Sequence, residues 1–215
     1  MIKVLVVDDH ELIRTGIGRL LTDYENIKVV GEAIDGEEAL SLARKVRPHV
    51  VLMDANMPGI GGLEATRRLI RFDPDLKVVA VTVHHEEPFP TKFMQAGASG
   101  YLTKGADISE IVMAIRQVHS GKRYITPEIA QEMALKAINP EDETPFDDLS
   151  DREMQVMIMI TQGQKVQYIS DQLFLSPKTI NSYRYRLFEK LKIENDVELT
   201  HMAIRYGLVE SEKII

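Results

Sequence analysis

The stretch IKVLVVDDH, residues 2–10, sets the fold class, because a Val-rich apolar run ends directly in two carboxylates. Such a run, bounded by polar residues, is typical of a buried β-strand. Similar runs predict strands at 28–34, 50–53, 77–83 and 100–102. The N-terminal half therefore carries five predicted strands.

Amphipathic segments separate these strands. Apolar residues recur at helical spacing within 12–21, 39–46, 63–70 and 108–115. Alternating strands and helices imply a parallel sheet, because each connection must cross over and the crossovers cover both faces. We expect an α/β domain over residues 1–121, with a five-stranded, parallel, doubly wound sheet of the flavodoxin-like type.

The overall composition excludes several protein classes. Of 215 residues, 44% are hydrophobic and 27% charged, which fits a folded globular protein and not a disordered one. The absence of cysteine excludes disulfides and thiolate metal sites. No apolar run reaches the length of a bilayer span, and Asp8 and Asp9 interrupt the region where a secretory signal would be apolar. We expect a cytoplasmic protein with no membrane partner.

The residue composition and the predicted elements change after residue 121. Pro127 favours the start of a connecting helix over 127–138, and 139–148 has two prolines, five acids and no base, which is typical of an exposed linker. Beyond it, helices are predicted at 151–161, 166–174, 177–191 and 196–206. We therefore expect a linker containing a helix over 122–148 and an all-α helix-turn-helix domain over 149–215.

Five polar side chains follow the ends of predicted strands. Asp8 and Asp9 end the first, Asp54 the third, Thr82 lies near the end of the fourth, and Lys104 follows the fifth. In a parallel sheet these ends share one edge. Three ionised carboxylates need a compensating cation there, so the sequence predicts a divalent metal site.

Oxygen ligands favour Mg²⁺ at this site. The ligand candidates are Asp9, Asp54 and the carbonyl of Asn56, with Asp8 as a ligand or an outer-sphere partner. The six histidines form no ligand set; His84 and His85, for example, are adjacent and are expected in an exposed loop.

A partly hydrated magnesium suits phosphoryl transfer, with Asp54 as the nucleophile that forms an acyl phosphate. Lys104 supplies a positive charge and Thr82 a hydroxyl donor. Tyr101 is an aromatic that swings inward when Thr82 is drawn toward the phosphate, which makes the site a switch and not an enzyme's turnover site. Taken alone, an Asp pair after a strand is more often a helix cap, and an aromatic on a last strand is commonly core.

Four motifs together carry a resemblance: VVDDH at 6–10, LMDANMPG at 52–59, VT at 81–82 and GYLTK at 100–104. They resemble the receiver domain of two-component response regulators. The resemblance implies phosphotransfer from a sensor histidine kinase to Asp54 with Mg²⁺ bound. Gly105 departs from the proline that often follows the lysine.

The predicted helix 177–191 has two distinct sides. Ile180, Tyr183, Leu187 and Leu191 share one and are expected to pack inward. The other presents the DNA-contact candidates Lys178, Asn181, Ser182, Tyr185 and Arg186, while Lys165 and Thr179 are placed for phosphate contacts. Net charge is −7, but residues 164–192 contain six bases and two acids. An acidic chain can thus carry a basic surface.

The motifs LSDRE at 149–153, ISDQL at 169–173, LSPKTIN at 175–181 and EKL at 189–191 resemble the LuxR/NarL (FixJ) DNA-binding domain. The whole chain is most similar to the GacA/UvrY/LetA group of regulators. That resemblance implies a hybrid sensor kinase, inverted repeats in double-stranded DNA upstream of small regulatory RNA genes, and a homodimer when phosphorylated, with the helix around 197–204 pairing two DNA-bound domains. For any single residue of that helix, such as Val197, Met202 or Ile204, a place in the core is the more common role.

Other functions stay open at this point. The helical domain is an RNA- or protein-binding output in one alternative, and a charged helix face is often only solvated surface. In another, the strand-end Asp serves a magnesium-dependent phosphatase. Such enzymes need a second acid two positions on, where this chain has Asn56.

Overall fold

The computed structural model describes residues 1–83, 88–138, 144–206 and 208. The chain divides into two compact units. The first comprises Met1–His85 and Phe89–Ala134, and the second continues from Leu135. His84, His85 and residues 139–143 of the predicted linker lie outside the described residues.

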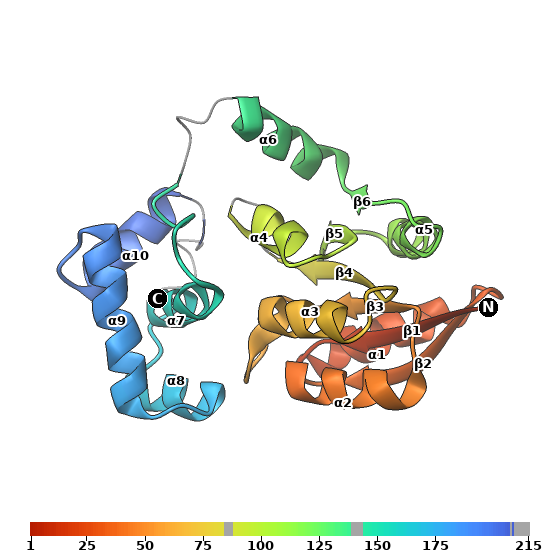
Figure 1. The fold of residues 1–215 in the computed structure, drawn as a ribbon, viewed down its shortest axis with the longest axis horizontal. Coiled ribbons are helices and arrows are strands. Elements are labelled where there is room, and N and C mark those ends of the chain that lie inside the picture. Colours follow the sequence, from red (N-terminus) through yellow and green to blue (C-terminus); the bar gives the residue numbers. More distant parts are fainter. Residues whose placement is uncertain (84–87, 139–143, 207, 209–215) are drawn as a thin grey trace. The chain divides into compact units, whose positions relative to one another are not determined.

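The N-terminal unit is a parallel sheet with strand order β2-β1-β3-β4-β5-β6 (Figure 1). Its strands are β1 Ile2–Val7, β2 Ile27–Ala33, β3 Val50–Met53, β4 Lys77–Thr82, β5 Gly100–Thr103 and β6 Tyr124–Ile125. Its helices are α1 Glu11–Leu21, α2 Gly36–Val46, α3 Gly61–Phe72, α4 Phe89–Gln95 and α5 Ile108–His119, and α6 Pro127–Ile138 follows β6. The parallel, doubly wound architecture is confirmed.

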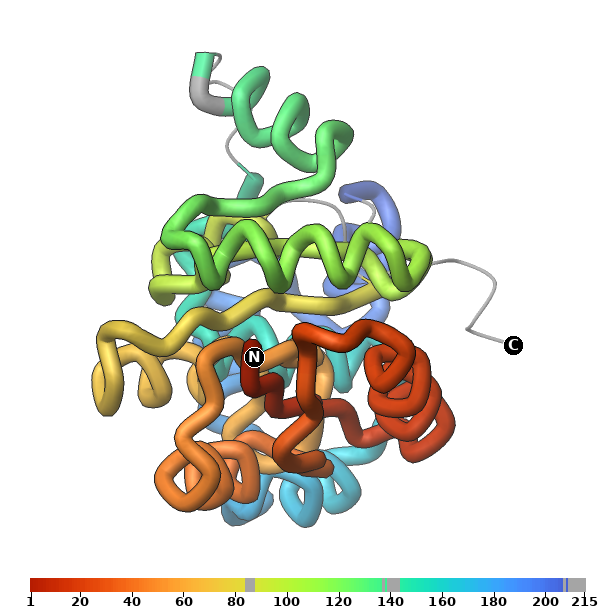
Figure 2. Tube along the Cα trace, turned by 90° about the vertical axis from the view of Figure 1, so that its right-hand side faces the viewer, coloured from red at the N-terminus to blue at the C-terminus, as the bar shows by residue number. Residues whose placement is uncertain are grey.

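Helices cover both faces of this sheet, which can be followed in Figures 1 and 2. On one face, Val4 and Leu52 belong to a core cluster with α5 residues such as Ile115. On the other, Leu5 and Met53 pack with α2 and α3. Alternate residues of each strand therefore serve opposite cores, which explains the continuous Val-rich runs.

Two elements differ from the prediction. The sheet has six strands and not five, because Tyr124–Ile125 pairs parallel to β5. Two residues are too short for an apolar run to reveal, and the Tyr124 hydroxyl anchors this edge by donating to Glu110 at 3.0 Å. Helix α4 was also not predicted, since a seven-residue helix with Pro90 in its first turn has almost no periodicity.

The helical unit contains α7 Asp151–Thr161, α8 Val166–Leu173, α9 Pro177–Leu191 and α10 Asp196–Arg205. Ser150 caps α7 in a reciprocal capping box with Glu153, and Ser176 caps α9. The predicted end of α8 is corrected by one residue, because Phe174 adopts a left-handed conformation with φ of 52°. In the part of the chain that the structure describes, no helix is long and apolar enough to cross a membrane.

The last residues of the predicted linker pack with the helical unit. Phe146 is fully buried and stacks edge-to-face on Tyr206 with ring centroids 5.6 Å apart. Asp147 pairs with Lys136 at 2.9 Å. Residues 144–148 thus belong to the helical unit, because one aromatic anchor outweighs the acidic composition that suggested exposure.

Candidate functional site

The carboxyl ends of β1, β3 and β5 meet around the ammonium group of Lys104. Lys104 Nζ lies 2.7 Å from Asp8 Oδ2 and 3.0 Å from Asp54 Oδ2. Val7 and Met53 are register partners, so Asp8 and Asp54 leave neighbouring strands at the same level. Asp8 and Asp54 are buried, while Asp9 is exposed at the rim. The sequence prediction brought these residues together correctly.

Burial makes Asp54 a weak acid. Loss of solvent raises its pKa to about 6; the charge of Asp8 adds to the rise, while Lys104 and the Asn56 backbone N–H oppose it. Burial alone would lower the pKa of Lys104, but the charges of Asp54 and Asp8 outweigh it, so this pKa lies above its ordinary value. The lysine therefore stays protonated between the two carboxylates.

The donor set fits a hard divalent cation. Ligand atoms of Asp8, Asp9, His10 and Asp54 all lie within 4.8 Å of one another. Asp54 Oδ2 is buried and, among the described residues, accepts no hydrogen bond, although Lys104 Nζ is within ion-pairing distance. A bound cation would use this oxygen. Asn56 lies at the same edge, beside Asp54.

The close approach of α3 to this edge depends on Gly62. A Cβ at this position would lie 1.8 Å from the carbonyl oxygen of Asp54. The backbone N–H of Gly62 donates to the carbonyl of Ala55 at 3.2 Å. A glycine is therefore required where the loop after β3 turns into α3.

Thr82 and Tyr101 lie deeper than the charged residues. Both are fully buried, and the Thr82 carbonyl accepts the Lys104 backbone N–H at 2.8 Å. The Tyr101 ring stacks edge-to-face on Phe93 with centroids 5.8 Å apart. Phe93 supplies the packing surface for the buried Tyr101 ring, and the expected inward swing on phosphorylation stays a prediction.

Sequence reasoning missed two residues at this site. His10 Nδ1 lies 2.8 Å from Asp9 Oδ1. Arg14 Nη1 donates to the Asp8 carbonyl at 2.8 Å, and its Nε lies 3.3 Å from Glu32 on β2. The adjacency in VVDDH was a usable signal for His10. Nothing in the sequence pairs Arg14 with Glu32.

Helix α9 of the second unit presents the predicted polar side. Lys178, Ser182, Tyr185 and Arg186 are exposed, and Asn181 is half-buried. On the opposite side Ile180, Leu187 and Leu191 are buried, while Tyr183 is only half-buried. Lys165 is exposed at the start of α8, and Thr179 Oγ1 lies 2.8 Å from the capping Ser176 hydroxyl.

The basic excess of residues 164–192 needs a correction. Arg184 makes a bidentate pair with Asp196, with both contacts at 2.6 Å. Lys190 Nζ lies 2.7 Å from the buried Glu153. These two bases are neutralised by acids from outside the counted segment. Exposed charge at Lys165, Lys178, Arg186 and Lys192 remains.

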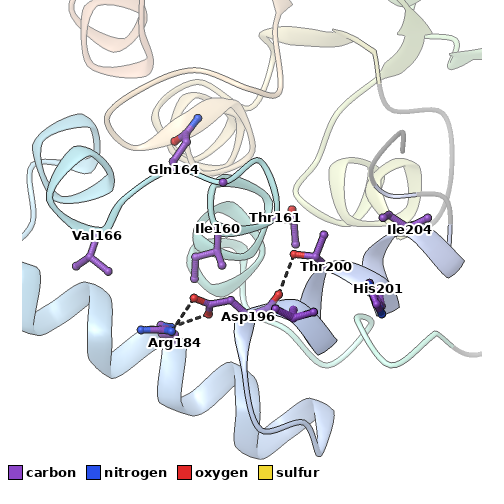
Figure 3. Close-up of a pocket in the computed structure, with 11 residues that line it drawn as sticks. Ile160, Thr161, Gln164, Val166, Arg184, Asp196, Thr200, His201 and Ile204 are labelled. Atoms are coloured by element: carbon purple, nitrogen blue, oxygen red, sulfur yellow. Dashed lines mark hydrogen bonds and ion pairs between the residues drawn. The ribbon is translucent and has the colours of Figure 1, made fainter. Parts of the chain in front are cut away.

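A cavity of about 580 Å³ lies beside α10 (Figure 3). Apolar side chains including Ile160, Val166 and Ile204 line it. Val197 lines the same cavity and is 63% exposed. Gln164 Oε1 is buried there with no hydrogen-bond partner in the described part of the chain. The outer side of α10 is thus an incompletely packed surface.

Comparisons with known proteins decide the family. The response regulator receiver domain matches residues 4–116, and the luxR family of bacterial regulatory proteins matches residues 147–203. The chain belongs to the LuxR-type two-component response regulators. A receiver domain implies a histidine-kinase partner and a divalent metal site, and the LuxR domain binds DNA. The regulator is a DNA-binding transcription factor and not a turnover enzyme.

Similar proteins cover nearly the whole regulator. It is 62% identical to the response regulator GacA of Pseudomonas aeruginosa over 98% of this chain and 99% of that protein. It is 61% identical to the response regulator UvrY of Escherichia coli (strain K12) over 100% and 99%. The solved structure of RcsB from Salmonella enterica serovar Typhimurium, bound to promoter rprA with a phosphomimetic, has a TM-score of 0.69 at 23% identity and covers 94% of this chain and 98% of that one.

Proposed function

We propose that Asp54 accepts a phosphoryl group from the phosphohistidine of a hybrid sensor kinase, and that this modification controls dimerisation and promoter binding. The observation that carries the proposal is the pair of contacts from Lys104 Nζ to Asp8 and Asp54. A buried carboxylate beside a fixed cation can accept a dianionic phosphoryl group, because the cation compensates the negative charge that is added.

The transfer itself is a displacement at phosphorus. An ionised Asp54 oxygen attacks, the P–O bond forms, the P–N bond to the imidazole breaks, and the leaving nitrogen keeps the electron pair. Lys104 balances charge on the phosphoryl oxygens, and the Thr82 hydroxyl donates to one of them. Asp9, Asp54 and the Asn56 carbonyl, with Asp8 as ligand or outer partner, would hold Mg²⁺, which would supply further charge neutralisation.

The output is binding of double-stranded DNA with inverted repeats, at promoters of small regulatory RNA genes. Lys178, Asn181, Ser182, Tyr185 and Arg186 are the proposed base and backbone contacts, with Lys165 and Thr179 on phosphates. Exposure of four of them on one side of α9 supports this assignment. The promoter complex solved for RcsB supports duplex DNA over an RNA- or protein-binding output.

The proposed dimer contact is α10. Val197 is exposed beside the apolar cavity of Figure 3, and a second copy would cover both. A donor from that copy would also satisfy Gln164 Oε1. We assign residues 1–121 to the receiver, 122–148 to the connection, whose last residues 144–148 pack with the helical unit, and 149–215 to the DNA-binding domain. We place the regulator in the cytoplasm.

A phosphorylation assay tests the phosphoacceptor assignment. The full chain incubated with radiolabelled acetyl phosphate and Mg²⁺ should acquire label that Asp54→Asn does not acquire. Asp148→Asn, an acid in the helical unit, is the matched control and should label as the parent does. Equal labelling of Asp54→Asn would refute the assignment, and sustained hydrolysis of phosphate esters would favour the phosphatase alternative.

A further inference from the structure

His10 occupies the N-cap of α1 without capping it. Its side chain makes no hydrogen bond to the first turn, where Ser, Thr, Asp or Asn would normally do so. The imidazole turns instead toward the carboxylates, with Nδ1 2.8 Å from Asp9 Oδ1 and 3.4 Å from Asp8 Oδ1. Its backbone N–H donates to the same Asp8 oxygen at 2.8 Å, which fixes the residue at the rim of the pocket.

These distances suit neighbouring ligands of one cation. Ligand atoms about 2.1 Å from an octahedral metal lie about 3 Å apart along each edge of the octahedron. The separations of His10 Nδ1 from the Asp9 and Asp8 oxygens, 2.8 and 3.4 Å, bracket that value. The ligand atom of buried Asp54 falls within the same 4.8 Å group.

We propose that His10 Nδ1 is an additional ligand of the divalent-cation site, which makes this receiver bind imidazole-preferring cations such as Co²⁺ and Zn²⁺. The inference rests on the cation site of the proposed function. Carboxylates alone favour Mg²⁺, whereas imidazole strengthens binding of Co²⁺ and Zn²⁺ and adds little for Mg²⁺, which keeps water instead.

Coordination would use the Nδ1 lone pair of the His10 ring, with the ring proton on Nε2. The side chain is 64% exposed, so solvent reaches both ring nitrogens and can exchange this proton.

Direct coordination differs from a merely orienting role. If His10 only holds Asp9 in place, removing the imidazole weakens every cation equally, because the carboxylate serves them all. If it is a ligand, Co²⁺ binding falls about tenfold while Mg²⁺ binding stays within about twofold. The ratio of the two affinities therefore separates the alternatives.

The test uses the full chain, without an affinity tag, titrated with Co²⁺ and followed by proton NMR and calorimetry. A Co²⁺-bound imidazole gives strongly shifted ring resonances. The wild-type protein should show them, and excess Mg²⁺ should remove them, which assigns the signal to the shared site. His10→Gln should lose them, whereas His119→Gln, a histidine at the end of α5, should keep them.

Each other outcome overturns the proposal. Co²⁺ bound in competition with Mg²⁺ but without imidazole resonances excludes His10 as a ligand, and so does an equal loss of both affinities in His10→Gln. If neither cation binds the wild-type protein, the cation site of the proposed function fails as well. His10→Asn repeats the test, and circular dichroism establishes that both variants fold.

Discussion

Asp54 ionises at a cost to folding, because its carboxylate is buried and the nearby Lys104 is shared with Asp8. In the metal-free protein its pKa is about 6, above the unfolded value of 3.8. The folded state therefore binds more protons than the unfolded state between about pH 4 and 6, and stability falls as pH rises through that window. A bound cation would reduce this cost and favour the ionised, nucleophilic form of Asp54.

Asp54→Asn should stabilise the metal-free regulator. The amide removes the cost of ionisation, so the gain in free energy of unfolding should be larger at pH 8 than at pH 5 by about 1 kcal/mol. Urea unfolding at the two pH values in a chelator measures this difference. A gain that is equal at both pH values would show that Asp54 titrates normally.

At the scale of elements, the junction of β3 and α3 is set by one glycine. Gly62→Ala places a Cβ against the Asp54 carbonyl and should cost about 3 kcal/mol, since backbone and not a flexible side chain must move. Gly16→Ala is the matched control in α1, with nothing within 4 Å of its Cβ, and should stabilise by about 1 kcal/mol. Thermal unfolding of both variants checks the pair, and similar shifts would contradict the packing described.

Helix α9 offers a second matched pair. Arg186→Ala should weaken duplex binding and reduce the salt slope of log K by about 1, because an exposed phosphate contact is lost. Arg184→Ala should leave that slope unchanged and lower stability by about 1 kcal/mol, because its guanidinium is bound to Asp196. Fluorescence anisotropy over a salt series separates them, and a reduced slope for Arg184→Ala would contradict the assignment of the DNA surface.

Elements with a strong hydrophobic period could be predicted from the sequence, whereas short elements that depend on tertiary contacts could not. The Val-rich strands and the capped helices α7 and α9 follow from local pattern. Helix α4 and strand β6 depend on tertiary packing, as the contact from Tyr124 to Glu110 illustrates. Phe146 lies in a segment with the composition of a linker. Its packing depends on the Tyr206 ring, which is distant in the sequence.

The position of the acidic pocket could be predicted from the topology, because the carboxyl ends of parallel strands lie at one edge of the sheet. The side-chain contacts around it could not be predicted. The contact of Arg14 with Glu32 and the neutralisation of Arg184 by Asp196 join different elements, which sequence spacing does not reveal. The buried state of Tyr101 depends on Phe93 from α4, a helix the periodicity did not reveal.

At the scale of the molecule, the net charge of −7 opposes DNA binding while α9 favours it. A dimer places two copies of α9 on one DNA site, and the added contacts compensate for this repulsion. Val197→Asp should therefore reduce binding to an inverted repeat at least about tenfold, by weakening the pairing of α10. Phosphorylation by acetyl phosphate is the control and should be unchanged; full DNA affinity in this variant would exclude α10 as the dimer contact.

The central claim is that modification at Asp54 governs DNA binding. Its most direct test is the affinity of the full chain for an inverted-repeat duplex, selected from random DNA, with and without beryllofluoride and Mg²⁺. The wild-type affinity should rise at least about tenfold, and Asp54→Asn should show no rise. An equal rise in Asp54→Asn, or no rise in the wild-type protein with beryllofluoride bound at Asp54, would contradict the account.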